Sequence, residues 1–356
     1  NGLSKIYETK ILIYNSTGNF FYSYNDNIKA TIISKTPHNG IKFSTLIKVW
    51  KELKKADIII SFMPSSSIYC LISKAIFNWD NILICKEVSI NNKLENNLKK
   101  FIKNYFYTLA NHIVCNTYKQ ANYLRKFKLL SSKTSTIFNG CDSKKITFKK
   151  KSFNDSHNKI FIVVGRISYP KNGLRLLEAL KLFYERNKFL PKIKWAGRID
   201  NTTFEDNDIY KRMVSFLENI PIVKNSFEFL GEVKDIYNLY EKADGLILPS
   251  IYEGLPYVIC ESMLKGCPVL ASNIADNELI LGSNEERGIL CDPLSIKSIC
   301  KGIEKIVFLR DQEALQMTLN ARKYAEKNFS NAQMIDKYQT LINQLIKKNY
   351  EKKFFK

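Results

Sequence analysis

The sequence predicts an α/β protein with two domains, each built on a parallel sheet that is flanked by helices. Short apolar segments alternate with longer amphipathic segments along nearly the whole chain, which is the pattern of consecutive βαβ units. The chain has 356 residues, more than one typical core accommodates. A polar stretch over residues 149–159, rich in lysine, serine and asparagine, is typical of a linker between two domains.

The first half contains six segments that favour strands and two that favour amphipathic helices. Strands are expected over residues 10–14, 30–34, 57–62, 82–85, 112–115 and 135–138, and helices over 44–55 and 94–109. Residues 63–67 are expected to form a loop after the third strand, and Lys86, Glu87 and Val88 a loop after the fourth. Asn139 and Gly140, after the last strand, are typical of a turn.

The second half repeats the alternation. Strands are expected over residues 160–164, 194–197, 227–231, 246–248, 268–271 and 288–291, and helices over 171–187, 235–242, 256–265, 296–309, 312–327 and 332–348. Ligands of open α/β sheets bind at the carboxyl ends of the strands. We therefore look for functional residues directly after each expected strand.

Residues 245–272 form a strand, a loop, a helix and the next strand. Pro256 is expected at the first helical position and Gly266 at the helix end. Glu253 falls in the loop and Glu261 in the helix, so both carboxylates are expected near the ligand crevice. Two glutamates at this spacing also suit an ordinary βαβ unit with solvated side chains.

This block resembles the Glu-x7-Glu signature of retaining nucleotide-sugar glycosyltransferases of the family 4 type, which have the GT-B fold. Glu253-Gly254-Leu255-Pro256 and Glu261 carry the resemblance, and Ala243-Asp244, Pro249-Ser250 and Gly266-x-Pro268 agree with it. The resemblance covers most of the chain and is densest over residues 165–293. It implies two Rossmann-like domains whose parallel sheets face each other across a cleft. They are an acceptor-side domain over 1–150 and a nucleotide-sugar-binding domain over 151–330, followed by a last helix, 331–356, that crosses back to the first domain.

A second motif is Gly165-Arg166-x4-Lys171, which follows the strand over 160–164 and resembles the diphosphate clamp of the same family. A nucleotide-sugar carries two adjacent phosphates, and the leaving diphosphate gains charge as the glycosidic bond breaks. Two cations held at a strand end can stabilise that charge in a site that excludes water. Surface cations alone would also explain the pattern, but its position ahead of the Glu-x7-Glu block supports the clamp.

The resemblance also implies individual roles. Glu261 would accept hydrogen bonds from the ribose hydroxyls, and Glu253 would face the donor sugar. Gly254 and Leu255 would offer backbone N–H groups to the diphosphate at the helix start. The catalytic candidates are Glu253, Arg166 and Lys171, and the donor-binding candidates are Gly165, Gly197, Val233, Gly254, Leu255, Pro256 and Glu261.

Two places depart from the family pattern. Many relatives carry a histidine in the first-domain loop where Val88 stands, so no catalytic histidine is assigned; His112 falls on a strand, and Glu87 is the polar candidate in that loop. The glycines that usually precede Glu-Leu-Ile are replaced by Ile274-Ala275-Asp276. A side chain then stands where the backbone would approach the sugar.

The start of the chain also differs from the resembled pattern. Residues 1–5 resemble the end of the first helix, and residues 10–14 the second strand. We therefore expect a first strand and a Gly-rich turn to precede Asn1. In the alternative, Ser16–Asn19 replaces that turn.

The net charge of +21 has two interpretations: a basic surface that faces anionic lipid or nucleic acid, or a composition rich in lysine throughout. The eight cysteines have neither Cys-x-x-Cys nor zinc spacing, which favours free thiols in a reducing cytosol. No apolar run reaches the ~18 residues of a membrane span, and no signal peptide opens the sequence. The tail over residues 347–356 mixes lysines with aromatic residues, so it suits a lipid interface or a frayed end.

The resemblance implies an enzyme that transfers a hexose-type sugar with retention of configuration, and the composition is consistent with a cytoplasmic or peripheral inner-membrane location. The expected donor is a nucleotide-sugar, and the expected acceptor is a hydroxyl of a saccharide or polyprenyl-linked saccharide, in surface polysaccharide or lipopolysaccharide synthesis. No cofactor or metal is expected, because Arg166 and Lys171 can carry the phosphate charge. The alternatives are a GT-B sugar-nucleotide epimerase, which lacks the Glu-Gly-Leu-Pro block, a basic nucleic-acid-binding protein, and a non-catalytic module that binds sugar nucleotides.

Overall fold

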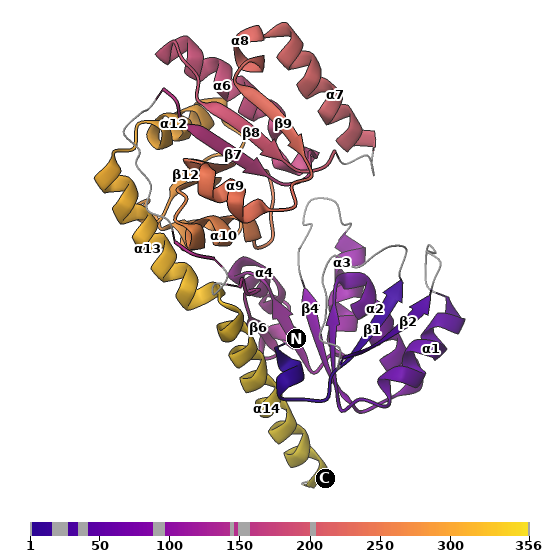
Figure 1. Ribbon diagram of the computed structural model, residues 1–356. Helices are drawn as coiled ribbons and strands as arrows, with labels where there is room; N and C mark the ends of the chain where they lie inside the picture. The colour runs from indigo at the N-terminus through magenta and orange to yellow at the C-terminus, as the bar shows by residue number, and fades with distance from the viewer. Residues whose placement is uncertain are drawn as a thin grey trace. The chain divides into compact units, whose positions relative to one another are not determined.

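The computed structural model describes residues 2–15, 28–34, 42–87, 97–142, 146–148, 157–199 and 204–354 (Figure 1). Ser16–Asn19, Val88 and most of the expected linker lie outside these ranges. The Cα positions divide the chain into two compact units. Unit 1 comprises residues 1–140 and 331–356, and unit 2 comprises residues 141–330.

Unit 1 contains two parallel sheets. β1 (Lys10–Asn15) pairs with β2 (Lys29–Ser34), and the second sheet has the order β3 (Ile58–Phe62), β4 (Ile82–Glu87), β5 (His112–Cys115) and β6 (Thr134–Thr136). Its helices are α1 (Phe43–Leu53), α2 (Pro64–Phe77), α3 (Asn97–Tyr107), α4 (Tyr118–Arg125) and α5 (Lys128–Ser131). β4 is buried along its whole length, as expected for a parallel strand covered on both faces.

Two local predictions for unit 1 are wrong. Residues 63–67 are not a loop, because α2 begins at Pro64; proline is favoured in the first turn of a helix, where its missing N–H costs no hydrogen bond. Lys86 and Glu87 are not in a loop either, because β4 continues through both and pairs with β5. Residues 1–5, expected as a helix end, contain the short 3₁₀ helix η1 (Leu3–Lys5).

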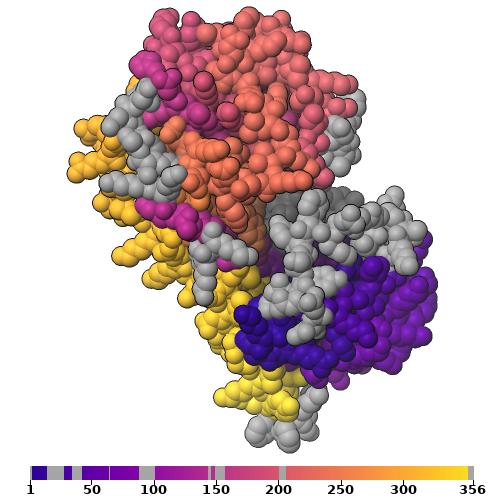
Figure 2. Space-filling view, in the orientation of Figure 1, coloured from indigo at the N-terminus to yellow at the C-terminus, as the bar shows by residue number. Residues whose placement is uncertain are grey.

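The C-terminal helix α14 (Asn331–Phe354) covers one face of the second sheet of unit 1. Its residues Tyr338, Leu341 and Ile342 pack with Ile84 and Val114 in one apolar cluster. The cluster extends to the start of the chain through partly buried apolar side chains that precede β1. The indigo N-terminal segment and the yellow helix accordingly lie side by side in Figures 1 and 2.

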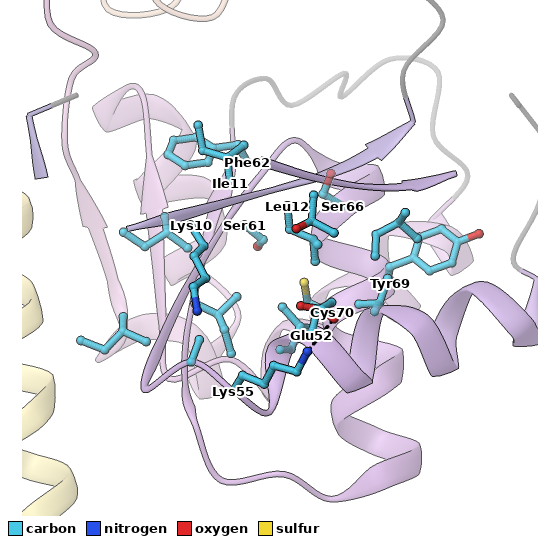
Figure 3. Close-up of a pocket in the computed structure, with 18 residues that line it drawn as sticks. Lys10, Ile11, Leu12, Glu52, Lys55, Ser61, Phe62, Ser66, Tyr69 and Cys70 are labelled. Atoms are coloured by element: carbon cyan, nitrogen blue, oxygen red, sulfur yellow. Dashed lines mark hydrogen bonds and ion pairs between the residues drawn. The ribbon is translucent and has the colours of Figure 1, made fainter. Parts of the chain in front are cut away.

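A cavity of about 250 Å³ lies between β1 and β3, with α1 and α2 as its other walls (Figure 3). Ile11 and Leu12 line it from β1, and Ile60 lines it from β3. At its rim, Lys55 Nζ donates to Glu52 Oε1 at 2.8 Å. Within the described ranges, β1 pairs only with β2 and β3 only with β4, so both strands present an unpaired edge to this cavity.

Unit 2 contains a six-stranded parallel sheet. Its order is β12 (Ile289–Cys291), β11 (Val269–Ser272), β10 (Gly245–Leu248), β7 (Ile160–Val164), β8 (Lys192–Ala196) and β9 (Phe227–Gly231). The helices are η2 (Tyr169–Lys171), α6 (Gly173–Asn187), α7 (Phe204–Asn219), α8 (Pro221–Lys224), α9 (Ile236–Lys242), α10 (Tyr257–Lys265), α11 (Asn277–Leu281), α12 (Ile296–Val307) and α13 (Asp311–Phe329). The core of unit 2 includes Phe161, Phe183 and Trp195, which are fully buried.

Unit 2 begins at Cys141, ahead of the polar stretch that marks the expected boundary. The Cys141 N–H donates to the carbonyl oxygen of Phe329 at 2.6 Å, so the first residue of the unit is tied to its last helix. All eight cysteines of the chain are buried free thiols. In the ranges that the structure covers, no helix combines the length and apolar character that crossing a membrane requires.

Candidate functional site

Three predicted site residues of unit 2 lie on loops where the strand order of its sheet reverses. From β7 the chain adds β8 and β9 on one side, then returns to place β10, β11 and β12 on the other. β7 and β10 are therefore neighbours, with Leu246 opposite Ile162. Open α/β sheets bind ligands at such a switch point, outside the carboxyl ends of the strands. The loops after β7 and β10 carry Arg166, Lys171 and Glu253 to this place.

Lys171 and Glu253, 82 residues apart in the sequence, form an ion pair across the switch point. Lys171 Nζ lies 2.5 Å from Glu253 Oε1, and the two side chains are 19% and 14% exposed. Ser250 Oγ donates to the same carboxylate oxygen at 2.8 Å. The pair joins a catalytic candidate from each motif. A cation and a carboxylate that both remain accessible can bind an anionic group and a sugar hydroxyl side by side.

Asn172, next to Lys171, is hydrogen-bonded to the loops after β10 and β12. Its side chain is buried, and its backbone has a left-handed conformation with φ 61°, which asparagine tolerates better than most residues. Its Nδ2 donates to the carbonyl oxygens of Pro249 at 2.8 Å and Pro293 at 2.7 Å. These bonds anchor the loops after β10 and β12 to the start of α6. Asn172 thereby positions its neighbour Lys171.

Two glycines allow the ends of β7 and β8 to approach each other closely. A Cβ atom on Gly197, where φ is 158°, would lie 1.9 Å from the carbonyl oxygen of Gly165. Gly165 has φ 148°, and its N–H donates to the carbonyl oxygen of Ala196 at 2.9 Å. Both predicted donor-binding glycines are thus required by the backbone, whatever they bind.

Glu261 lies on α10 and accepts a hydrogen bond from the Tyr240 hydroxyl of α9 at 3.1 Å. Burial raises the pKa of Glu261, and the Tyr240 hydrogen bond works in the opposite direction. Burial, together with the Glu261 charge, raises the pKa of Tyr240 well above its usual value. Tyr240 was not among the candidates predicted from the sequence, because it belongs to no recognisable motif and lies on α9, before β10, and not after a strand.

The loop between β10 and α10 carries Gly254, Leu255 and Pro256. Pro256 was expected at the first helical position of α10. The helix instead begins one residue later, at Tyr257, and Pro256 is its N-cap with φ −75°. Leu255 is buried and Gly254 half-buried. The helix ends at Gly266 with φ 75°, as predicted.

Three further predicted positions lie at neighbouring strand ends. Arg166 directly follows Gly165 and is exposed. Val233 follows β9 and is half-buried. In the loop after β11, Ala275 has φ 46°, a conformation that suits glycine, so a side chain does occupy the position of the expected glycine.

Glu87, the candidate from unit 1, lies inside β4 and is fully buried. Its Oε2 accepts a hydrogen bond from the Tyr107 hydroxyl, whose pKa is raised by burial and by the Glu87 charge. Lys86 donates to Asn139, and burial lowers the pKa of Lys86 to about 8. The prediction that Glu87 stands in an open loop is wrong, because its polar partner comes from α3 and allows the carboxyl to be buried.

His112 forms a hydrogen bond between two strands of unit 1. Its Nε2 shares a hydrogen bond of 2.9 Å with Ser135 Oγ of the neighbouring strand β6. Burial and nearby lysines lower its pKa to about 4, so the ring is neutral at physiological pH. Across the described residues, no group of three His, Cys, Asp or Glu side chains is placed to hold a metal ion. Metal-independent chemistry remains a prediction.

Comparison with known families and relatives adds a second line of evidence. The family described as "Glycosyl transferases group 1" matches residues 144–327, which is 184 of the 356 residues. A Campylobacter jejuni protein is 26% identical over 96% of this chain and 92% of its own length. It is named GalNAc-alpha-(1->4)-GalNAc-alpha-(1->3)-diNAcBac-PP-undecaprenol alpha-1,4-N-acetyl-D-galactosaminyltransferase. An Escherichia coli UDP-Gal:alpha-D-GlcNAc-diphosphoundecaprenol alpha-1,3-galactosyltransferase is 28% identical over 60% of this chain and 55% of its own length.

Solved structures show the same fold. Sucrose-phosphate synthase from Thermosynechococcus elongatus superposes with a TM-score of 0.79 at 16% identity, covering 96% of this chain and 90% of its own. Anabaena HepE in complex with UDP and glucose gives a TM-score of 0.75 at 18% identity, covering 89% and 86%. With two parallel-sheet units in the chain, these likenesses confirm the predicted GT-B fold.

Proposed function

We propose that this chain, which belongs to the group 1 glycosyl transferases, moves a hexose-type sugar from a nucleotide-sugar to a hydroxyl of a lipid-linked saccharide, with retention of configuration. The observation that carries the proposal is the Lys171–Glu253 pair at the switch point of unit 2. The pair brings a cation and a carboxylate together on the loops of two neighbouring strands, which supports the binding of a diphosphate beside a sugar.

The proposed division of roles is the one that the family resemblance implies. Arg166 and Lys171 would stabilise the charge that develops on the leaving diphosphate, in the manner of a preorganised electrostatic site. Backbone N–H groups of Gly254 and Leu255, just ahead of α10, would meet the same phosphates. Glu261 would bind the ribose hydroxyls, and Glu253 would face the sugar.

The acceptor and the stereochemistry are inferred from the relatives. The names of both bacterial relatives state an α-linked product and a lipid-diphosphate acceptor. An α-linked donor would give such a product by retention. We infer that the chain acts in the synthesis of a surface polysaccharide or lipopolysaccharide, at the inner face of the cytoplasmic membrane.

The test is a panel of nucleotide-sugars, first by thermal shift and then by transfer to an undecaprenyl-diphosphate saccharide. A donor that binds the native state raises the melting temperature, and only that donor should support transfer. The anomeric configuration of the product, read by NMR, should equal that of the donor. Arg166→Ala should reduce transfer at least tenfold with an unchanged melting temperature. No stabilisation by any nucleotide-sugar, or an inverted product, would contradict the proposal.

A further inference from the structure

The positive charge of the chain is concentrated in unit 1. Unit 1 carries 26 Lys and Arg against 9 Asp and Glu, whereas unit 2 carries 29 against 25. The formal net charges are therefore +17 and +4. A lysine-rich composition spread over the whole chain would charge both units alike. The excess of positive charge lies in unit 1, and it favours an anionic partner for that unit.

Within unit 1 the acidic residues are missing from one continuous stretch. Residues 96–141 contain eight Lys and Arg and no Asp or Glu. This stretch includes α3, α4 and α5. Lys126 and Lys128 are exposed at the turn between α4 and α5. The stretch therefore has a formal net charge of +8.

Large apolar side chains are exposed in the same stretch. On α3, Phe101 is 57%, Ile102 46% and Tyr105 59% exposed, and on α5 Leu129 is 61% exposed. The opposite face of α3 is fixed in the core through Tyr107, which is buried. One helix face thus packs on the sheet, while the other presents apolar side chains to solvent. Such a patch usually marks a binding surface.

A ring contact links the exposed face of α3 to the residue that precedes α5. The ring of Phe101 meets that of Phe127, just before α5, edge to face at 6.1 Å. Phe127 stands between Lys126 and Lys128. The α3–α5 surface, defined as Phe101, Ile102, Tyr105, Lys126, Lys128 and Leu129, therefore combines apolar and cationic side chains on adjoining elements.

We propose that the α3–α5 surface docks unit 1 on a membrane leaflet with anionic headgroups. Its apolar side chains would enter the boundary between headgroups and acyl chains, while its lysines meet lipid phosphates. Single-stranded nucleic acid is bound by stacking on aromatic rings, and the aliphatic Ile102 and Leu129 offer no such stacking. A bilayer takes up both kinds of side chain. The proposal rests on the proposed function only in that a lipid-linked acceptor lies at a membrane.

The test is flotation of the full chain with vesicles of phosphatidylglycerol and phosphatidylcholine, or of phosphatidylcholine alone. The wild type should float with the anionic vesicles, and high salt should release part of it. Lys126→Glu/Lys128→Glu should lower the partition into anionic vesicles about tenfold or more. Phe101→Ser/Tyr105→Ser should lower it as well, and the loss should persist at high salt, because it removes the apolar contribution.

Matched variants on unit 2 control for charge and exposed apolar area. Lys297→Glu/Lys301→Glu changes the charge by the same amount on α12, and Leu294→Ser/Leu319→Ser removes side chains that are 59% and 45% exposed. Both controls should float like the wild type. Circular dichroism and melting temperature should be unchanged in all four variants, because only exposed side chains are altered.

Several outcomes would overturn the proposal. They are a wild type that does not float with anionic vesicles, controls that lose as much binding as the surface variants, or surface variants that float normally. Binding to an oligonucleotide that both surface variants abolish, without flotation, would identify nucleic acid as the partner instead. Thermal shift by nucleotide-sugars should be the same in the surface variants and the wild type. A chain that floats but responds to no nucleotide-sugar would refute the proposed function and leave the docking surface standing.

Discussion

Replacing Lys171 or Glu253 should separate nucleotide binding from sugar transfer. At 2.5 Å and an effective dielectric constant of about 20, the attraction between the two charges is roughly 7 kcal/mol. Both side chains keep some contact with solvent, and both are partly desolvated, so the net coupling should be about 1–3 kcal/mol. In the ligand-free protein, Glu253 therefore competes with a diphosphate for Lys171.

Calorimetry with a nucleoside diphosphate measures this competition. Lys171→Ala should weaken binding roughly 10- to 100-fold, which is the loss of one charge-assisted contact. Glu253→Gln should leave binding unchanged or tighten it, while transfer of the sugar falls at least tenfold. In the double variant, the effect of Glu253→Gln on affinity should vanish, because the competing pair no longer exists.

Lys305→Ala provides the matched control, since Lys305 on α12 pairs with Glu285 at 2.5 Å and neither residue belongs to the predicted site. This variant should lower the free energy of unfolding without changing nucleotide affinity. Equal losses of affinity in Lys171→Ala and Glu253→Gln would refute the reasoning. They would mean that Glu253 itself contacts the nucleotide, or that the pair only maintains the shape of the loops.

Three further predictions concern pH, backbone geometry and local stability. Because burial raises the pKa of Glu261, the folded protein holds this proton more tightly than the unfolded chain does, so the wild type should gain stability relative to Glu261→Gln as the pH falls from neutral into the acid range. Urea unfolding at several pH values measures this gain. A free energy of unfolding that rises in Glu261→Gln relative to the wild type on acidification would contradict the prediction. Gly197→Ala should cost about 1–3 kcal/mol in the free energy of unfolding and weaken nucleotide binding, because its Cβ would lie 1.9 Å from a carbonyl oxygen at the end of β7. Gly231→Ala, with φ 67° and open space around the added atom, should cost about 1 kcal/mol and serves as the control. Hydrogen exchange should be faster in Ile58–Phe62, which has one unpaired edge within the described ranges, than in Ile160–Val164, which lies between two strands; equal protection of the two strands would contradict this.

Local patterns in the sequence were sufficient to predict much of the fold. The apolar segment over residues 160–164 is β7, because a strand buried on both faces leaves a continuous apolar run. The segment over 57–62 is β3 apart from its first residue, although only Ile59 and Ser61 of that strand are buried. The prediction failed at residues 63–67, where three serines after a proline suit both a loop and the first turn of a helix. It also failed at Lys86 and Glu87, because two consecutive charged residues after an apolar segment favour a loop when only the local sequence is considered.

The sequence by itself determined the αβ alternation, the two motifs and the residue types that can hold a diphosphate. Only the tertiary structure decided that β7 and β10 are neighbours, so that Lys171 meets Glu253. It likewise decided that Tyr240 donates to Glu261, and that Glu87 is buried against Tyr107. The physical reason is that periodicity and turn chemistry depend on residues a few positions apart. Strand order and the burial of a charge depend instead on partners that the chain supplies from distant elements.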